Sequence, residues 1–203
     1  MKIKRYNKNK LTHKNIILLM LVIINLYFVI NISSQVKEEW VVRYNGPGND
    51  WDSALAIALD SSGNVYVTGY SYGSGTSLDY ATIKYNNEGV EQWVARYNGP
   101  GNRYDQSNAI AVDSSGNVYV TGESWGSGTE YDYATIKYNN EGVEQWVARY
   151  NGPTNNYDMS KAIAIDSAGN VYVTGYSYGS GTSRDYATIK YSQSTFSESF
   201  YLY

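Results

Sequence analysis

After residue 35, apolar and polar side chains alternate in short runs. Trp93–Asn98, Asn117–Gly122 and Asp132–Asn139 each alternate with a period of two, and Ala109–Asp113 is a shorter run of small and aliphatic residues. Alternation over four to eight residues, with many β-branched and aromatic side chains, is typical of strands. No segment after residue 35 has a convincing helical period, so we expect an all-β fold for residues 36–203.

Glycine-bearing turns separate these runs. Asp113–Gly116 (DSSG) and Asn139–Gly142 (NNEG) each place glycine where a tight hairpin requires a positive φ. Hairpins of this kind join neighbouring antiparallel strands, so the sequence predicts a meander.

The whole pattern is written three times with a period of 53 residues, starting at Trp40, Trp93 and Trp146. The repeats are 40–92, 93–145 and 146–203. We expect strands near 40–45, 54–60, 64–70 and 79–86, and again 53 and 106 residues further on. Four strands in roughly 40–50 residues make one blade of a β-propeller, so the predicted fold consists of four-stranded antiparallel meanders.

The string A-I-A-x-D-S-x-G-N-V-Y-V-T-G occurs at 56–69, 109–122 and 162–175. Together with DYATIKY and the tryptophan-bearing strand, it resembles the SBBP-type bacterial β-propeller repeat. The resemblance extends from Trp40 to about Tyr191. It implies a propeller in an extracytoplasmic bacterial protein, often as one module of a larger surface or secreted protein, and it implies no activity, catalytic residue or cofactor.

Three copies predict an incomplete propeller, since 4–8 blades usually close the ring. The first tryptophan strand stands alone, and YSQSTFSESFYLY at 191–203 replaces the expected YNNEGVEQWVARY, leaving 196–203 as a ragged outer strand. A fragment of a larger protein is one interpretation. The other is self-association through the open blade faces, with two chains pairing into a six-bladed ring.

The N-terminal 35 residues are of a different kind. Six of the 16 basic residues and no acidic residue lie here, ahead of an apolar run at 16–30. This pattern predicts a signal peptide, with a cleavage zone at 32–35; an uncleaved membrane anchor is the alternative. In both cases the repeats are expected outside the cytoplasm, with membrane contact only through an uncleaved segment.

Composition removes several function classes. Cysteine is absent and the only histidine is His13, which excludes thiolate nucleophiles, histidine–serine chemistry and Cys/His metal sites from the repeats. Outside the leader, ten basic residues face 19 acidic ones, so we expect no nucleic-acid partner. We expect no metal and no cofactor.

The first two repeats differ at 11 of 53 positions, and nine of these lie in 46–55 against 99–108 and 70–78 against 123–131. In a meander, both segments emerge at the same end, which we call the loop face. Binding residues concentrate on loops, and aromatic side chains are favoured anchors. The candidate binding residues for a protein or glycan are Trp51, Tyr104, Tyr157, Tyr72, Trp125, Tyr178, Arg103 and Glu123. Unconstrained drift of the loops is the alternative explanation.

Carboxylates allow two other interpretations. The repeated Asp60, Asp113 and Asp166 favour turn capping over a calcium loop, because each turn supplies one carboxylate. Glu123 and Glu130 occur only in the second repeat, and a pair of acids could hydrolyse a glycosidic bond. A non-enzymatic binding or scaffold module is the main prediction, and a carboxylate-dependent glycoside hydrolase or lyase is the alternative.

Overall fold

The computed structural model describes residues 12–30 and 35–193. The expected outer strand at 196–203 and most of the expected cleavage zone lie outside these residues. The chain falls into two units, one up to Glu39 and one from Trp40. In the first unit, the apolar run forms α1 (His13–Ile30). Within the described residues, no helix combines the length and apolarity needed to span a membrane.

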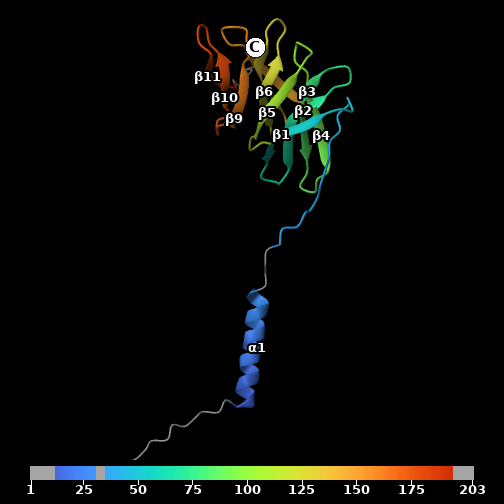
Figure 1. The fold of residues 1–203 in the computed structure, drawn as a ribbon, viewed down its shortest axis with the longest axis vertical. Coiled ribbons are helices and arrows are strands. Elements are labelled where there is room, and N and C mark those ends of the chain that lie inside the picture. The colour runs from blue at the N-terminus through green and yellow to red at the C-terminus, as the bar shows by residue number, and fades with distance from the viewer. Residues whose placement is uncertain (1–11, 31–34, 194–203) are drawn as a thin grey trace, which may run out of the picture. The chain divides into compact units, whose positions relative to one another are not determined.

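The second unit is all-β in its described part and contains three antiparallel sheets, which follow one another along the chain (Figure 1). Blade 1 comprises β1 (Asp52–Leu59), β2 (Val65–Tyr72), β3 (Leu78–Tyr85) and β4 (Glu91–Tyr97). Blade 2 comprises β5 (Asp105–Val112), β6 (Val118–Trp125), β7 (Tyr131–Tyr138) and β8 (Glu144–Tyr150). Blade 3 comprises β9 (Met159–Ile165), β10 (Val171–Tyr178) and β11 (Arg184–Tyr191). The predicted fold class, propeller blades in an unclosed arrangement, is confirmed.

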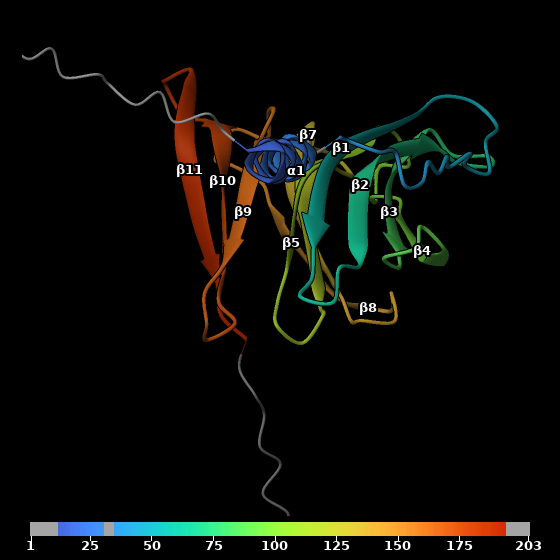
Figure 2. The same cartoon turned by 90° about the horizontal axis from the view of Figure 1, so that it is seen from below.

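Each sheet is a simple meander, because the tight turns join neighbouring strands. Gly63, Gly116 and Gly169 end the first turn of each blade at φ values of 78–81°, which non-glycine residues rarely adopt. The inner strands β1, β5 and β9 lie next to one another at one edge of the three sheets (Figure 2). Blades of a propeller crowd most at this edge, which suits the small side chains of the Ala-Ile-Ala runs.

One strand prediction was wrong. Residues 40–45 form no strand, although the equivalent segments form β4 and β8. Those segments pair with β3 and β7, whereas the described residues before Trp40 contain no sheet that could pair with 40–45. Blade 3 has three strands within the described residues, and the outer strand expected at 196–203 lies outside them.

The core consists of contacts between blades, because each sheet has one aromatic and one aliphatic face. The aromatic face of blade 1 packs on the aliphatic face of blade 2, and blade 2 packs on blade 3 in the same way. In blade 1 the aromatic face comprises Tyr66, Tyr80, Trp93 and Tyr97; in blade 2 the aliphatic face comprises Val118, Val120, Ala134 and Ile136. Tilted and edge-on ring pairs, such as Tyr80 with Tyr97 at 5.5 Å, order the aromatic side.

Hydrogen bonds repeat at both interfaces and fix the stacking of one blade on the next. The Tyr80 hydroxyl donates to the Ala134 carbonyl at 3.2 Å, and the Tyr133 hydroxyl donates to the Ala187 carbonyl at 3.3 Å. The buried hydroxyls of Thr121 and Ser160 lie 2.8 Å apart. Because these groups are buried, leaving any of them without a partner would be costly. The repeats therefore specify one docking geometry.

Candidate binding face

Backbone and side-chain hydrogen bonds bring the two variable segments of each repeat together at one end of the blades. The amide of Gly48 donates to the Tyr72 carbonyl at 3.0 Å, and the amide of Gly101 donates to the Trp125 carbonyl at 3.2 Å. In blade 3, the hydroxyl of Thr154 donates to the carbonyl of Tyr178 at 3.0 Å. The structure therefore places these loops side by side, as the alternation of strand direction predicts.

The loop preceding each inner strand is held by its own side chains. Asn49, Asn102 and Asn155 have φ values of 50–53°, in the left-handed region that asparagine tolerates better than most residues. The side chain of Asn98 donates to Asn102 at 2.7 Å. These contacts give the exposed side chains a rigid support.

In blades 1 and 2, an arginine of the outer strand and an aspartate hold the same end of the sheet. Arg149 donates to the Ser124 carbonyl at 2.9 Å, to the Ser124 hydroxyl at 2.6 Å and to Asp132 at 2.9 Å. Burial opposes the charge, but Asp132 and Tyr97 hold the pKa of Arg149 above its ordinary value. The outer strand is thereby tied to the root of the β6–β7 loop.

Two of the predicted aromatic residues, Trp125 and Tyr157, form a cluster with Arg103 where blades 2 and 3 meet. The Arg103 guanidinium lies 5.0 Å from the ring centre of Trp125. Trp125 contacts Tyr131 edge-on at 5.0 Å, and Tyr131 contacts Tyr157 at 5.7 Å. Three of the predicted residues are thus joined through Tyr131, which the prediction missed. Tyr131 itself lies in a variable segment and occurs only in the second repeat, and this signal could have identified it.

The other predicted aromatic residues lie at the same end. A hydrogen bond between the hydroxyls of Tyr72 and Tyr104 links blades 1 and 2 and raises the pKa of Tyr72. Trp51 is 75% exposed, and its carbonyl accepts the amide of Tyr72 at 3.3 Å. Tyr178 accepts a hydrogen bond from Arg184 at 3.3 Å, at the outer side of blade 3. The aromatic residues therefore extend over all three blades.

Glu123 lies apart from this exposed row, inside the interface between blades 2 and 3. It accepts hydrogen bonds from Asn108 and from Gln106, and its carboxylate is 3.5 Å from the Lys161 ammonium. Burial raises the pKa of the Glu123 carboxyl, and Lys161 and Asn108 oppose that rise. These contacts account for Glu123 as part of the packing between blades, and none of them involves Glu130.

The repeated aspartates lie at the opposite end and cap their turns. Asp113 accepts hydrogen bonds from the amides of Ser115 and Asn117, from the Asn117 side chain and from the Tyr119 hydroxyl, at 2.8–3.1 Å. Within the described residues no group of three acidic or histidine side chains could hold a metal ion. The hydrogen bonds that the Asp113 carboxylate accepts therefore stabilise its own turn.

Stacked antiparallel meanders with repeated interfaces define a β-propeller repeat protein. The SBBP β-propeller repeat matches residues 39–75, 92–128 and 145–181, which is more than half of the chain, and the chain belongs to this family. Among solved structures, a fucose lectin from Kordia zhangzhouensis in complex with methyl-fucoside is similar at 14% identity, with a TM-score of 0.41. The alignment covers 68% of this chain and 96% of the lectin chain. No curated protein sequence matches.

Proposed function

We propose that the chain is a non-enzymatic binding module that acts outside the cytoplasm and holds a glycan on its loop face. The observation that supports this most directly is the set of exposed aromatic side chains at one end of the three blades. Trp51, Tyr104 and Tyr157 are 75%, 47% and 39% exposed. Aromatic side chains on rigid loops bind ligands at a low entropic cost.

The chemistry of this set of side chains suits a sugar. The apolar face of a pyranose ring can pack on an exposed indole or phenol ring, and tyrosine hydroxyls and a guanidinium can hydrogen-bond its hydroxyl groups. Arg103 over Trp125 and the Tyr72–Tyr104 pair provide both kinds of contact at the joints between blades. A protein ligand would use the same aromatic anchors and is the alternative partner.

A glycan array probed with the full chain tests the proposal. We expect retention of a defined set of glycans, and loss of at least tenfold in affinity for Trp51→Ala or Tyr104→Ala, since each removes an exposed anchor. Val143→Ser is the matched control, because Val143 is similarly exposed but follows a turn at the opposite end. Equal binding by all variants would contradict a site on the loop face.

The proposed location rests on the basic leader and the apolar run that forms α1. Mass spectrometry of the chain recovered from outside the cytoplasm should find an N-terminus near Gln35 or Val36. An intact Met1 in the membrane fraction would favour the anchor instead.

Hydrolysis of polysaccharide is the second candidate, and the raised pKa of Glu123 is the observation that favours it. Its partners Lys161 and Asn108 explain the same residue structurally. Turnover of chromogenic glycosides that Glu123→Gln abolishes would favour the enzyme over the binding module.

A further inference from the structure

The two outer faces of the arc are the two halves of the interface that the blades use internally. Blade 3 presents its aromatic face, where Tyr186 is 98% exposed, although its equivalents Tyr80 and Tyr133 are fully buried. Blade 1 presents its aliphatic face, where Ile57 and Leu59 are 64% and 63% exposed. Internally, an aromatic face always packs on an aliphatic one.

Residues 40–45 already occupy the position of an outer strand from a preceding blade. The Trp40 indole donates to the Asn87 carbonyl at 3.2 Å, as the Trp93 indole donates to Asn140 at 3.1 Å. Arg96 donates to the Tyr44 hydroxyl at 3.3 Å, as Arg149 donates to Tyr97 at 3.0 Å. The segment therefore lies on blade 1 as β4 lies on blade 2, without the three inner strands that would complete its sheet.

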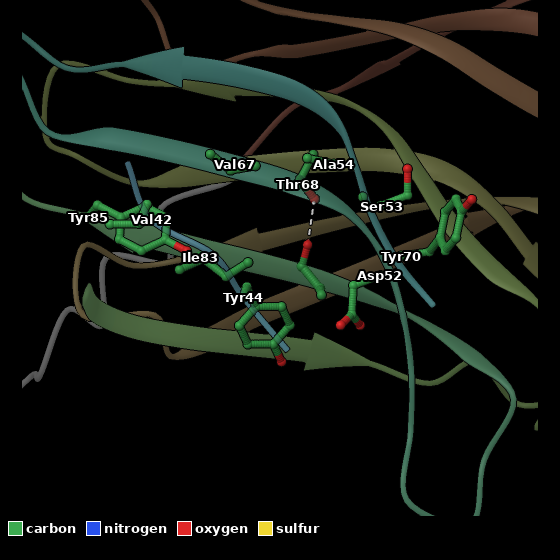
Figure 3. A pocket seen from close by; sticks show the side chains of 12 residues that line it. Val42, Tyr44, Asp52, Ser53, Ala54, Val67, Thr68, Tyr70, Ile83 and Tyr85 are labelled. Carbon is green, nitrogen blue, oxygen red and sulfur yellow. Dashed lines mark hydrogen bonds between the residues drawn. The ribbon is translucent and has the colours of Figure 1, made fainter. Parts of the chain in front are cut away.

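Beside this segment is a hollow of about 190 Å³, lined by Tyr44, Ala54, Val67, Thr68 and Ile83 among others (Figure 3). The corresponding surfaces of blades 2 and 3 are covered by the tyrosines and threonine of the preceding blade. The hollow is therefore where the inner strands of a preceding blade would pack.

Within the described residues, blade 3 lacks the arginine contact that blades 1 and 2 have. Ser177 is 4% exposed, and its hydroxyl has no hydrogen-bond partner among the described residues. The equivalent Ser71 and Ser124 each accept a hydrogen bond from the arginine of their outer strand. Arg43 is the arginine of the lone segment; it is exposed, and none of the hydrogen bonds or ion pairs found within 12–30 and 35–193 involves it.

We propose that blade 3 of one chain docks on blade 1 of a second copy, and that residues 40–45 of the second copy become the fourth strand of that blade. The internal register of β3 and β4 pairs Thr82 with Ala95 and Ala81 with Arg96. Transferred by the 53-residue period, it pairs Thr188 with Val42 and Ala187 with Arg43. Arg43 then reaches Ser177 and Asp185, and the Tyr186 hydroxyl reaches the Ala81 carbonyl.

Two such contacts close a symmetric pair of chains with six blades, within the range at which propellers close. A heterologous interface that did not close would give an open polymer instead. One internal contact has no counterpart: Ala54 stands where Ser107 and Ser160 bond to the preceding threonine. Ala54→Ser adds one hydrogen bond at each of the two contacts and should therefore tighten the dimer by about 25-fold, which is about fivefold per contact.

Disulfide trapping tests the register, because the native chain has no cysteine. In the full chain, Thr188→Cys combined with Val42→Cys should give a covalent dimer on a non-reducing gel, since directly opposed strand residues fit a disulfide. Thr188→Cys combined with Val41→Cys is the matched control, because a shift of one residue turns the side chain to the other face and Arg43 is retained. Equal trapping in both variants, or a disulfide within one chain, would overturn the proposal.

Light scattering of the full chain gives the second measurement. We expect a two-chain mass, and a weakening of the dimer by at least tenfold for Arg43→Ala but not for Lys37→Ala, which removes a positive charge that precedes residues 40–45 in the sequence. Association through α1 would leave both variants unchanged and would overturn the proposal. So would a monomer at all concentrations, or a polymer that grows with concentration.

Discussion

Blades 2 and 3 contain nearly the same strands, yet they bury them differently. The central segments VYVTG and DYATIKY are identical in both blades. Tyr133 and Thr121 in blade 2 are fully buried, whereas Tyr186 in blade 3 is almost fully exposed and Thr174 is half-buried. The local sequence is the same, so the difference comes from the neighbouring sheet.

This comparison shows where the stability of the arc lies. In repeat proteins, each interface between neighbours contributes much of the folding free energy. Blade 2 takes part in two interfaces and blade 3 in one among the described residues. Equivalent substitutions in the two blades therefore measure the interface directly, with the local strand held constant.

The largest difference is expected for tyrosine to alanine on the aromatic face. Tyr133→Ala removes a fully buried ring and its hydrogen bond to Ala187, and should cost about 3–5 kcal/mol. Tyr186→Ala should change the free energy of unfolding of the monomer by less than about 0.5 kcal/mol. Urea unfolding followed by tryptophan fluorescence, at concentrations where the chain is monomeric, measures both.

Equal losses for the two tyrosine variants would mean that Tyr186 is covered in solution. If the loss for Tyr186→Ala appears only at concentrations where dimers form, the covering partner is a second chain.

Strain in the tight turns should rank next and should be almost independent of the neighbour. Gly116→Val places a β-branched residue at a φ of 78°, which should cost about 1–3 kcal/mol. Gly169→Val, at a φ of 81°, should cost nearly as much, although open space surrounds Gly169 whereas Asn140 lies close to Gly116. Tyr131→Ser should cost less than either. Thermal melts compare the three variants, and a harmless Gly169→Val would refute the φ argument.

The sequence predicted what is local and repeated. The period, the strands and the glycine turns follow from alternation and backbone preferences, and these are the same in every copy. The sequence could not show that 40–45 stays unpaired, because Val41–Tyr44 is nearly identical to Val94–Tyr97 and differs only in its neighbour. The sequence analysis also missed two ion pairs, Arg96 with Asp79 and Lys161 with Glu123, because each joins residues far apart in sequence.

For the candidate site, the sequence predicted the position of the loops but not the grouping of their side chains. Direction reversal in a meander was enough to bring the variable loops to one end. The grouping of Arg103, Trp125 and Tyr157 around Tyr131 depends on the stacking of blade 3 on blade 2, and a strand pattern contains no information on that stacking. For the same reason Glu123 was assigned to the loops, whereas it lies in the packing between blades.

A smaller contrast is expected at the threonine hydroxyls. Thr121 is buried and bonded to both Thr135 and Ser160, so Thr121→Val should cost about 1 kcal/mol. Thr174 bonds to Thr188, and among the described residues no serine of a following blade reaches it, so Thr174→Val should be close to neutral. Valine keeps the shape of the side chain, so urea unfolding should report the hydroxyl alone. A larger loss of stability for Thr174→Val than for Thr121→Val would contradict this expectation.

The smallest effect concerns the turn aspartates, which the comparison predicts to be equal in the two blades. Burial of Asp113 opposes its charge but is outweighed by hydrogen bonds from Asn117, and its pKa lies below the ordinary 3.8. Asn170 holds the pKa of Asp166 below the same value. A carboxyl with a lowered folded pKa stabilises the fold above its unfolded pKa, and this contribution is lost as the pH falls through the folded value.

Stability should therefore decline below about pH 4, and Asp113→Asn and Asp166→Asn should each flatten that decline by a similar amount, since asparagine keeps the turn but does not titrate. Urea midpoints measured from pH 2 to pH 7 test this, with Glu141→Gln as the control for an exposed acid in a neighbouring turn. A flattening confined to Asp113→Asn would show that the neighbouring blade, and not the turn itself, lowers the pKa of the carboxylate. In that case the difference between the blades would extend from their faces to their turns.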